Sequence, residues 1–257
     1  MSVITNPEDL AYMRESGRRL GRVVDAVARM IAPGVSVADL NKKADELIRA
    51  TGDTPAFLNY KPWGADRPFP ASICISVNEE VVHGIPNENP HVIEEGDIVS
   101  LDCGLTHHGL ISDHAVSVVA GTADAETQRL LDATREGMMA GINAARAGNR
   151  VGDISAAIEA IGVKYGYGIV QSLGGHGVGY RVHEEPYIPN VGDAGTGPEL
   201  IAGMVLAIEP MFTEGTDEVD LLDDGYTYVT TDGSRNAHFE HTILVTDGEP
   251  EILTRLQ

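Results

Sequence analysis

The sequence predicts an α+β fold with a mainly antiparallel sheet, built as a single domain over residues 1–257. Segments typical of strands come in runs rather than alternating strictly with helices, which favours antiparallel pairing. The expected order is a helix pair, strands, a second helix pair and more strands, a coarse twofold organisation without sequence identity between the halves. No linker rich in Pro, Gly or Ser divides the chain.

The first half is expected to begin with two helices. Asn6 can cap the first helix, Pro7 suits its first position, and apolar residues follow helical spacing as far as Ile31. A second helix is expected over residues 36–50. Strands rich in Ile, Val and Leu are expected over residues 73–77, 97–103 and 110–119.

The second half is expected to repeat this order. Helices are expected near residues 124–147 and 152–163, and strands around 205–208, 226–230 and 238–245. In the first half, between the second helix and the strand expected over residues 73–77, the Pro- and Gly-rich stretch 61–70 is typical of a surface loop.

The composition excludes several classes of protein. No apolar run approaches the roughly 20 residues that span a bilayer. The N-terminus has neither the basic start nor the apolar block of a signal peptide. Only two cysteines are present, Cys74 and Cys103, which argues against a disulfide framework or a Cys-type zinc site and suits a reducing cytoplasm. Any bound metal must therefore use His and carboxylate ligands.

The charge is strongly negative and unevenly distributed. The formal net charge of −21 repels nucleic acid in general. Residues 1–50, however, hold eight basic and seven acidic side chains, so nearly all of the negative charge lies beyond them. The simplest interpretation is a pair of ordinary solvated helices. The alternative is a face that can approach RNA.

Two aspartates, Asp102 and Asp113, lie on the strands that a short turn over residues 106–109 connects. A hairpin centred between His107 and His108 pairs the two aspartates directly, so that both carboxylates face one side of the sheet. Like charges placed so close destabilise a fold unless a cation lies between them. The pair therefore indicates either a divalent metal site or two solvent-facing aspartates.

Three further segments favour the metal site. His176 lies among four glycines, which allow a backbone to approach a site closely. Glu209 ends one apolar strand and Glu240 begins another, where an ionised carboxylate is costly without a counter-charge. Each alone is more typical of a paired core or edge residue. Four carboxylates and one imidazole together are typical of a two-metal hydrolase.

These segments resemble the type I methionine aminopeptidase family over about residues 7–254. The motifs that carry the resemblance lie at residues 78–86, 102–104, 174–179, 183–186, 208–210 and 240–242. The resemblance implies the "pita-bread" α+β fold, with pseudo-twofold halves. In that fold a curved, mainly antiparallel sheet holds the metals on its concave face and carries helices on its convex face.

The resemblance also implies a role for each candidate ligand. Asp102 would bind one metal and His176 the other, Asp113 and Glu240 would bridge the two, and Glu209 would complete the set. Two divalent metal ions are implied. They could be cobalt, manganese, iron or zinc, because His and carboxylate ligands accept all four.

The implied reaction removes the initiator methionine from a nascent protein when the second residue is small. A water activated by two metals attacks the first peptide bond. Glu209 would act as the general base, His183 would donate a hydrogen bond to the developing oxyanion, and His83 would contact the scissile amide. The alternative for both histidines is structural packing. His238 and His241 are expected to lie outside the ligands, at most in contact with them.

A mainly apolar pocket would hold the first side chain of the substrate. The substrate-binding candidates are His83, His183, Tyr60, Phe69, Cys74 and Tyr226, with Phe57 and Val182 as further lining residues. Val182 and Tyr226 stand where the family commonly has larger aromatic residues, and Phe69 where tyrosine is frequent. Cys74 could equally be a core cysteine. The chemistry is therefore better supported than the side-chain preference.

Two other functions are open. Proline-directed peptidases of the same fold usually carry a separate N-terminal domain, for which this length leaves no room, although Ser112-Asp113 resembles their motif. A binding protein that kept the fold would typically have lost metal ligands. We expect a cytoplasmic monomer that acts on the N-termini of nascent polypeptides. The ribosome near the exit tunnel is a further expected partner, and neither DNA nor a membrane is expected.

Overall fold

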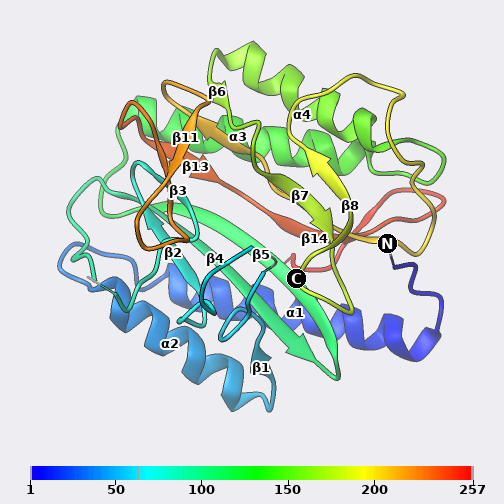
Figure 1. The fold of residues 1–257 in the computed structure, drawn as a ribbon, viewed down its shortest axis with the longest axis horizontal. Helices are drawn as coiled ribbons and strands as arrows, with labels where there is room; N and C mark the ends of the chain where they lie inside the picture. The colour runs from blue at the N-terminus through cyan, green and yellow to red at the C-terminus, as the bar shows by residue number, and fades with distance from the viewer. Residues whose placement is uncertain (1, 63, 89, 256–257) are drawn as a thin grey trace.

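The computed structural model describes residues 2–62, 64–88 and 90–255, and two helix pairs flank its strands (Figure 1). The helices are α1 (Pro7–Ala28), α2 (Val37–Ala50), α3 (Ala125–Ala144) and α4 (Val151–Tyr165). The strands of the first half are β1 (Thr54–Pro55), β2 (Cys74–Val77), β3 (Glu80–Val82), β4 (Ile98–His107) and β5 (Leu110–Val119). Those of the second half are β6 (Gly168–Ile169), β7 (Gly174–Gly177), β8 (Glu184–Pro189), β9 (Val205–Ile208), β10 (Met211–Thr213), β11 (Val219–Leu221), β12 (Tyr228–Thr230), β13 (Asn236–His238), β14 (His241–Leu244) and β15 (Glu251–Ile252).

The helix ends follow their capping residues. The Asn6 side chain accepts a hydrogen bond from the amide of Glu8 and Pro7 follows it, so α1 begins where the sequence predicted. α1 ends at Ala28, three residues before the expected Ile31, with Arg29 as its C-cap. No helix in the described part of the chain is long and apolar enough to cross a membrane.

All strand pairs among the described residues are antiparallel, which confirms the predicted sheet type. In the first half β4 lies between β1 and β2 and also pairs with β5. In the second half the order is β15-β14-β9-β7-β8. The single strand expected over residues 238–245 is interrupted at residues 239–240, between β13 and β14. This interruption matters because it contains Glu240.

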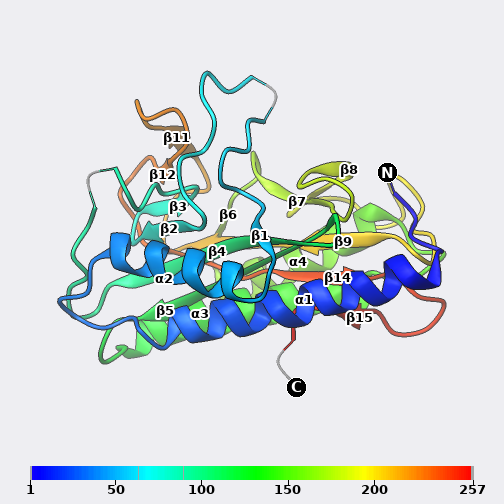
Figure 2. The same ribbon diagram turned by 90° about the horizontal axis from the view of Figure 1, so that it is seen from below.

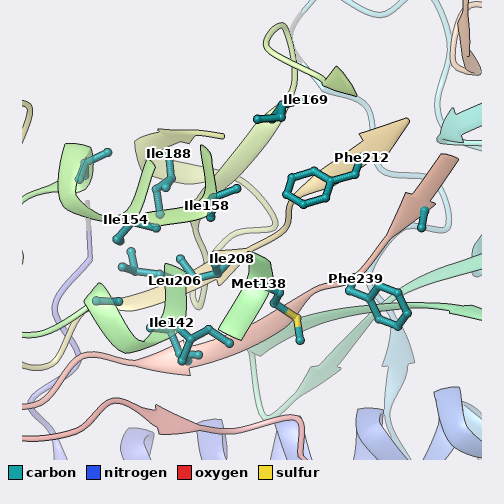
Figure 3. Close-up of a cluster of buried hydrophobic side chains, with 14 of the residues drawn as sticks. Met138, Ile142, Ile154, Ile158, Ile169, Ile188, Leu206, Ile208, Phe212 and Phe239 are labelled. Atoms are coloured by element: carbon teal, nitrogen blue, oxygen red, sulfur yellow. The ribbon is translucent and has the colours of Figure 1, made fainter. Parts of the chain in front are cut away.

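Each half has its own hydrophobic core. α1 and α2 cover the first, which includes Leu20, Ile48 and Leu101. α3 and α4 cover the second, where Ile158 and Phe212 pack with the strands beneath them (Figure 3). Residues 56–62 and 64–73, between β1 and β2, and the β11–β12 hairpin project from the side of the sheet away from α1 (Figure 2). The predicted surface loop, apart from residue 63, which lies outside the described residues, thus forms part of a wall above the sheet.

Candidate metal centre

Strands from both halves bring the five predicted metal ligands to one place. Asp102 lies on β4, Asp113 on β5 and His176 on β7, while Glu209 directly follows β9 and Glu240 directly precedes β14. Asp113, His176 and Glu240 each offer a ligand atom, and these atoms lie within 4.8 Å of one another. Oε1 of Glu209 lies 3.4 Å from Nε2 of His176. Asp102 lines one cavity together with these four residues.

The predicted pairing of Asp102 directly with Asp113 was wrong, because the turn is centred one residue later. His108 and Gly109 form the turn with φ values of 49° and 81°, as a two-residue hairpin loop requires. Asp102 therefore pairs with Ala115. Asp113 pairs with Gly104, which lies two positions from Asp102 on β4. Since side chains alternate with a period of two, both carboxylates still face the same side, as diagonal neighbours.

Hydrogen bonds between the halves hold this arrangement. The hydroxyl of Thr242 accepts from the amide of Asp113 at 2.8 Å and donates to its carbonyl at 2.7 Å. The amide of Glu240 donates to the carbonyl of Ala115 at 2.9 Å. The segment that carries Glu240 is thereby fixed against the strand that carries Asp113.

The glycines around His176 allow β7 to pack closely against its neighbouring strands. A Cβ on Gly175 would lie 2.3 Å from the carbonyl oxygen of Ala207 on β9. A Cβ on Gly177 would lie 2.3 Å from the carbonyl oxygen of Glu185 on β8. Neither distance is possible between real atoms, so β7 can fit between its neighbours only without side chains at these positions. This close fit places His176 beside the carboxylates.

The electrostatics of the cluster match a cation site. Burial raises the pKa of Glu209 to about 8 and that of Asp102 to about 7. Burial and the neighbouring carboxylates raise the pKa values of Asp113 and Glu240 well above the ordinary range. Oδ1 of Asp102 and Oε1 of Glu240 are buried without a hydrogen-bond partner among the described residues. Unsatisfied carboxylate oxygens around a common centre fit a divalent metal.

The histidines beside the cluster are neutral. Burial lowers the pKa of His176 to about 3 and that of His83 to about 4, and it also lowers the pKa of His183. His83 directly follows β3 and has a φ of 61°, an uncommon value that the surrounding structure must maintain. Nδ1 of His183 lies 2.9 Å from the hydroxyl of Tyr60. A neutral imidazole can serve as a metal ligand or as a hydrogen-bond donor.

Two cavities meet at the cluster. One has a volume of about 420 Å³ and is lined by all six predicted pocket residues, Phe57, Tyr60, Phe69, Cys74, Val182 and Tyr226. Burial raises the pKa of Cys74 well above its ordinary value, so this lining presents a thiol rather than a thiolate. The other cavity, of about 830 Å³, shares His83, His183 and several ligand candidates with the first. The arrangement can hold an apolar side chain on one side and the rest of a peptide on the other.

The sequence analysis missed two residues of the site and left the role of a third open. Tyr228 and Leu221, on β12 and β11, also line the smaller cavity. His238 was expected at most to contact the ligands, and its Nε2 lies 3.5 Å from Oε2 of Glu209. A signal for His238 was present, because residues two apart in an extended segment share a face and Glu240 is two residues away.

Comparisons with known proteins agree with this geometry. Residues 11–247 match metallopeptidase family M24. A methionine aminopeptidase from Aquifex aeolicus (strain VF5) is 45% identical over 250 residues, 96% of each chain. The crystal structure of a methionine aminopeptidase from Thermotoga maritima is 41% identical, with a TM-score of 0.93 over 99% of this chain and 100% of that one.

The prolidase from Pyrococcus furiosus, at 22% identity, shares the fold alone, with a TM-score of 0.76 over 99% of this chain and 66% of that one. The expected pita-bread fold is therefore confirmed. The family match over most of the length and the full-length relatives lead to one conclusion. This chain belongs to metallopeptidase family M24.

Proposed function

We propose that this protein is a methionine aminopeptidase, which removes the initiator methionine from nascent proteins when the second residue is small. The observation that carries the proposal is the mainly apolar cavity that opens onto the four clustered carboxylates and one imidazole. A first side chain in this cavity leaves the first peptide bond beside the cluster. The names of full-length relatives support the same function.

The five clustered residues, Asp102, Asp113, His176, Glu209 and Glu240, would hold two divalent ions. Cobalt, manganese, iron and zinc all suit His and carboxylate ligands. When bound, the metals would supply a water of lowered pKa and polarise the scissile carbonyl.

The remaining chemistry belongs to the side chains. Glu209 would accept the proton of the attacking water and pass it to the leaving amine, as a general base and then acid. The Tyr60 hydroxyl can donate to Nδ1 of His183, which leaves the proton of that ring on Nε2. His183 would then donate to the developing oxyanion, and His83 would contact the amide.

The decisive experiment is hydrolysis of the peptide Met-Ala-Ser by metal-free protein, with metals added back one at a time. We expect no activity after chelation and recovery with at least one of the four metals. Asp113→Ala and Glu240→Ala should stay inactive when metal is restored, because each removes a proposed bridge. Full activity in a verified metal-free sample would refute the mechanism.

Selectivity tests the methionine assignment separately. An unbranched thioether side chain fits an irregular lining and gains from aromatic edges. One methylene in such a pocket is worth only about 1–3 kcal/mol, so leucine should be accepted weakly, while lysine should be rejected. We expect kcat/KM for Met-Ala to exceed that for Leu-Ala, Lys-Ala and Met-Leu peptides. Equal values for Met-Ala and Lys-Ala would instead indicate a broad aminopeptidase.

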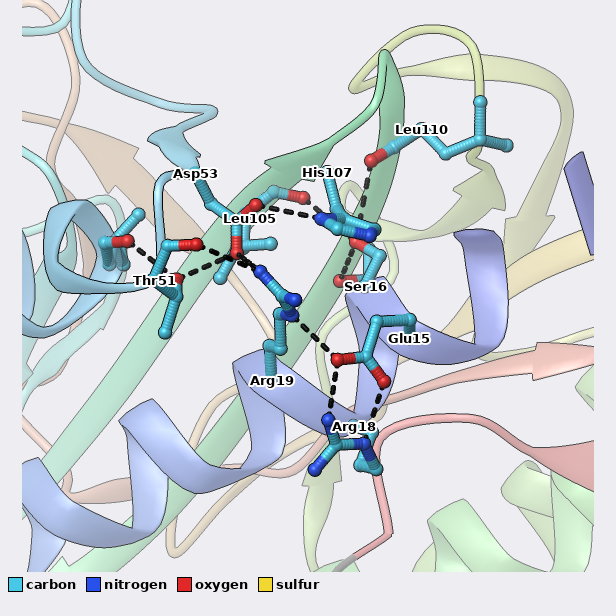
Figure 4. A network of polar contacts seen from close by, with 11 residues as sticks. Glu15, Ser16, Arg18, Arg19, Thr51, Asp53, Leu105, His107 and Leu110 are labelled. Carbon is cyan, nitrogen blue, oxygen red and sulfur yellow. Dashed lines mark hydrogen bonds and ion pairs between the residues drawn. The ribbon is translucent and has the colours of Figure 1, made fainter. Parts of the chain in front are cut away.

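We further propose that the protein works in the cytoplasm, beside the exit tunnel of the ribosome, with α1 and α2 towards the RNA. Much of the positive charge on α1 is already neutralised. Arg18 and Arg19 both pair with Glu15, and Arg19 also lies 2.9 Å from Asp53 (Figure 4). Arg22 is exposed and makes no ion pair with a described residue. It is therefore the candidate on α1 for a phosphate contact.

The charge reversal Arg22→Glu should weaken ribosome binding in a salt-dependent way and leave Met-Ala-Ser hydrolysis unchanged. The triple reversal of Arg18, Arg19 and Arg22 should weaken it further. Arg146→Glu, beyond the end of α3, is a control with the same change in net charge as Arg22→Glu. Equal binding by the parent and Arg22→Glu, measured by cosedimentation at two salt concentrations, would contradict the orientation.

A further inference from the structure

His238 presents a polar side chain that no residue in the described part of the chain satisfies. It is the last residue of β13 and only 1% of it is exposed to solvent. Neither ring nitrogen makes a hydrogen bond with a described residue. A buried group left without a partner costs free energy. Such a group calls for a functional explanation.

The ring lies against the proposed general base. Nε2 of His238 is 3.5 Å from Oε2 of Glu209, while Oε1 of the same carboxyl is 3.4 Å from Nε2 of His176. The Glu209 carboxyl thus lies between two imidazoles, one of which is a proposed ligand. An imidazole ring can carry a proton on Nε2 and donate it to a neighbouring carboxylate.

Hydrogen bonds to β5 hold the backbone of His238 in place. Its amide donates to Oγ of Ser117 at 2.8 Å, and the same hydroxyl donates back to its carbonyl at 2.9 Å. Ser100 contacts Ser117 at 2.7 Å and completes this buried group. β13 also pairs with β10, where Met211 faces His238. A buried side chain on a backbone held in this way suits the orientation of a neighbouring ligand.

We propose that His238 is a positioning residue for Glu209, to whose Oε2 it donates its Nε2–H so that Oε1 is directed at the metal centre. The present distance is at the outer limit of a hydrogen bond. Glu209 is ionised when it serves as a metal ligand. A hydrogen bond to a charged acceptor is shorter and stronger than one to a neutral acceptor. This inference rests on the proposed metal roles of Glu209 and His176.

The test is calorimetric titration of Mn²⁺ into metal-free protein, which measures Mn²⁺ affinity for the parent, His238→Gln and His238→Leu. The Gln amide can replace the lost donor, whereas Leu fills the space without one. Loss of such an outer partner typically weakens metal binding about 10–100-fold. We expect that loss for His238→Leu at one of the two sites, and affinity within about threefold of the parent for His238→Gln.

Equal Mn²⁺ affinity of His238→Leu and the parent would overturn the inference. An equal loss in both variants would also overturn it, because the ring itself would then be needed, as a ligand or as packing. The melting temperature of each metal-free variant separates misfolding from lost metal, and His238→Met replaces the Leu variant if that does not fold.

A double variant tests whether the effect runs through Glu209. In a Glu209→Gln background, His238→Leu should cost no further Mn²⁺ affinity, and a full additional loss would contradict the positioning role. If the parent binds no Mn²⁺, the same series is titrated with whichever of cobalt, iron and zinc it does bind. A parent protein that binds none of the four metals would refute the proposed function itself, which is a different outcome from all of these.

Discussion

The contact between Tyr60 and His183 has a consequence that can be measured. The Tyr60 hydroxyl lies 2.9 Å from Nδ1, and burial keeps His183 neutral by lowering its pKa. Tyr60→Phe removes the group that holds the proton on Nε2. A net hydrogen bond is worth about 0.5–1.5 kcal/mol, so kcat for Met-Ala-Ser should fall about 2- to 10-fold.

His183→Ala is the matched variant at this scale, because it removes the donor itself. Its kcat should fall on the order of 100-fold or more if the imidazole stabilises the oxyanion. Both variants should keep the metal content of the parent, measured by elemental analysis. Loss of metal in either variant would mean that His183 belongs among the ligands.

At the scale of elements, β7 depends on the absence of side chains at its glycines. Gly175→Ala would place a Cβ 2.3 Å from the carbonyl oxygen of Ala207, so β7 must separate from β9. Overpacking of this kind costs typically about 1–3 kcal/mol. The shift also moves His176 relative to the other ligands. We therefore expect a lower melting temperature together with weaker Mn²⁺ binding.

Gly248→Ala provides the control for this prediction. The nearest atom to its Cβ, the hydroxyl oxygen of Thr246, is 3.9 Å away, which is ordinary contact. Its melting temperature and Mn²⁺ affinity should match those of the parent. A Gly175→Ala variant that behaves like Gly248→Ala would show that the two strands can separate at no cost.

At the scale of the whole molecule, the buried carboxyls link stability to pH. In the metal-free protein the pKa values of Asp102 and Glu209 are raised to about 7 and about 8, from 3.8 and 4.5. Below pH 3.8 the folded and unfolded chains both keep these protons. As pH rises further, the unfolded chain releases them first, so their contribution to folding stability is lost progressively up to about pH 8.

Metal should remove this dependence, because it replaces the protons as the counter-charge. We expect the melting temperature of chelator-treated protein to fall between pH 5 and pH 8, and saturating Mn²⁺ to abolish most of that fall. The double variant Asp102→Asn, Glu209→Gln cannot titrate at these positions and should show a smaller fall without metal. A fall as steep in the double variant as in the parent would assign the effect to other groups.

Much of the architecture and of the candidate site could be predicted from local patterns. Asn6 and Pro7 predicted the start of α1, and the limits of β5 and β9 agree with the expected segments. Capping and periodicity act between neighbours in the chain, so the sequence records them directly. The five candidate ligands were also recognisable, because carboxylates on apolar strands are costly without a cation.

The sequence by itself determined which residues could bind metal and which face of the hairpin they share. Only the tertiary structure decided the register of the hairpin. Side chains on a strand alternate between its two faces, so a shift of β5 by two positions along β4 leaves Asp102 and Asp113 on the same face. The tertiary structure also decided the break before β14 and the placement of His238 against Glu209. These features depend on contacts between segments far apart in the chain, and such contacts leave no periodic pattern in either segment.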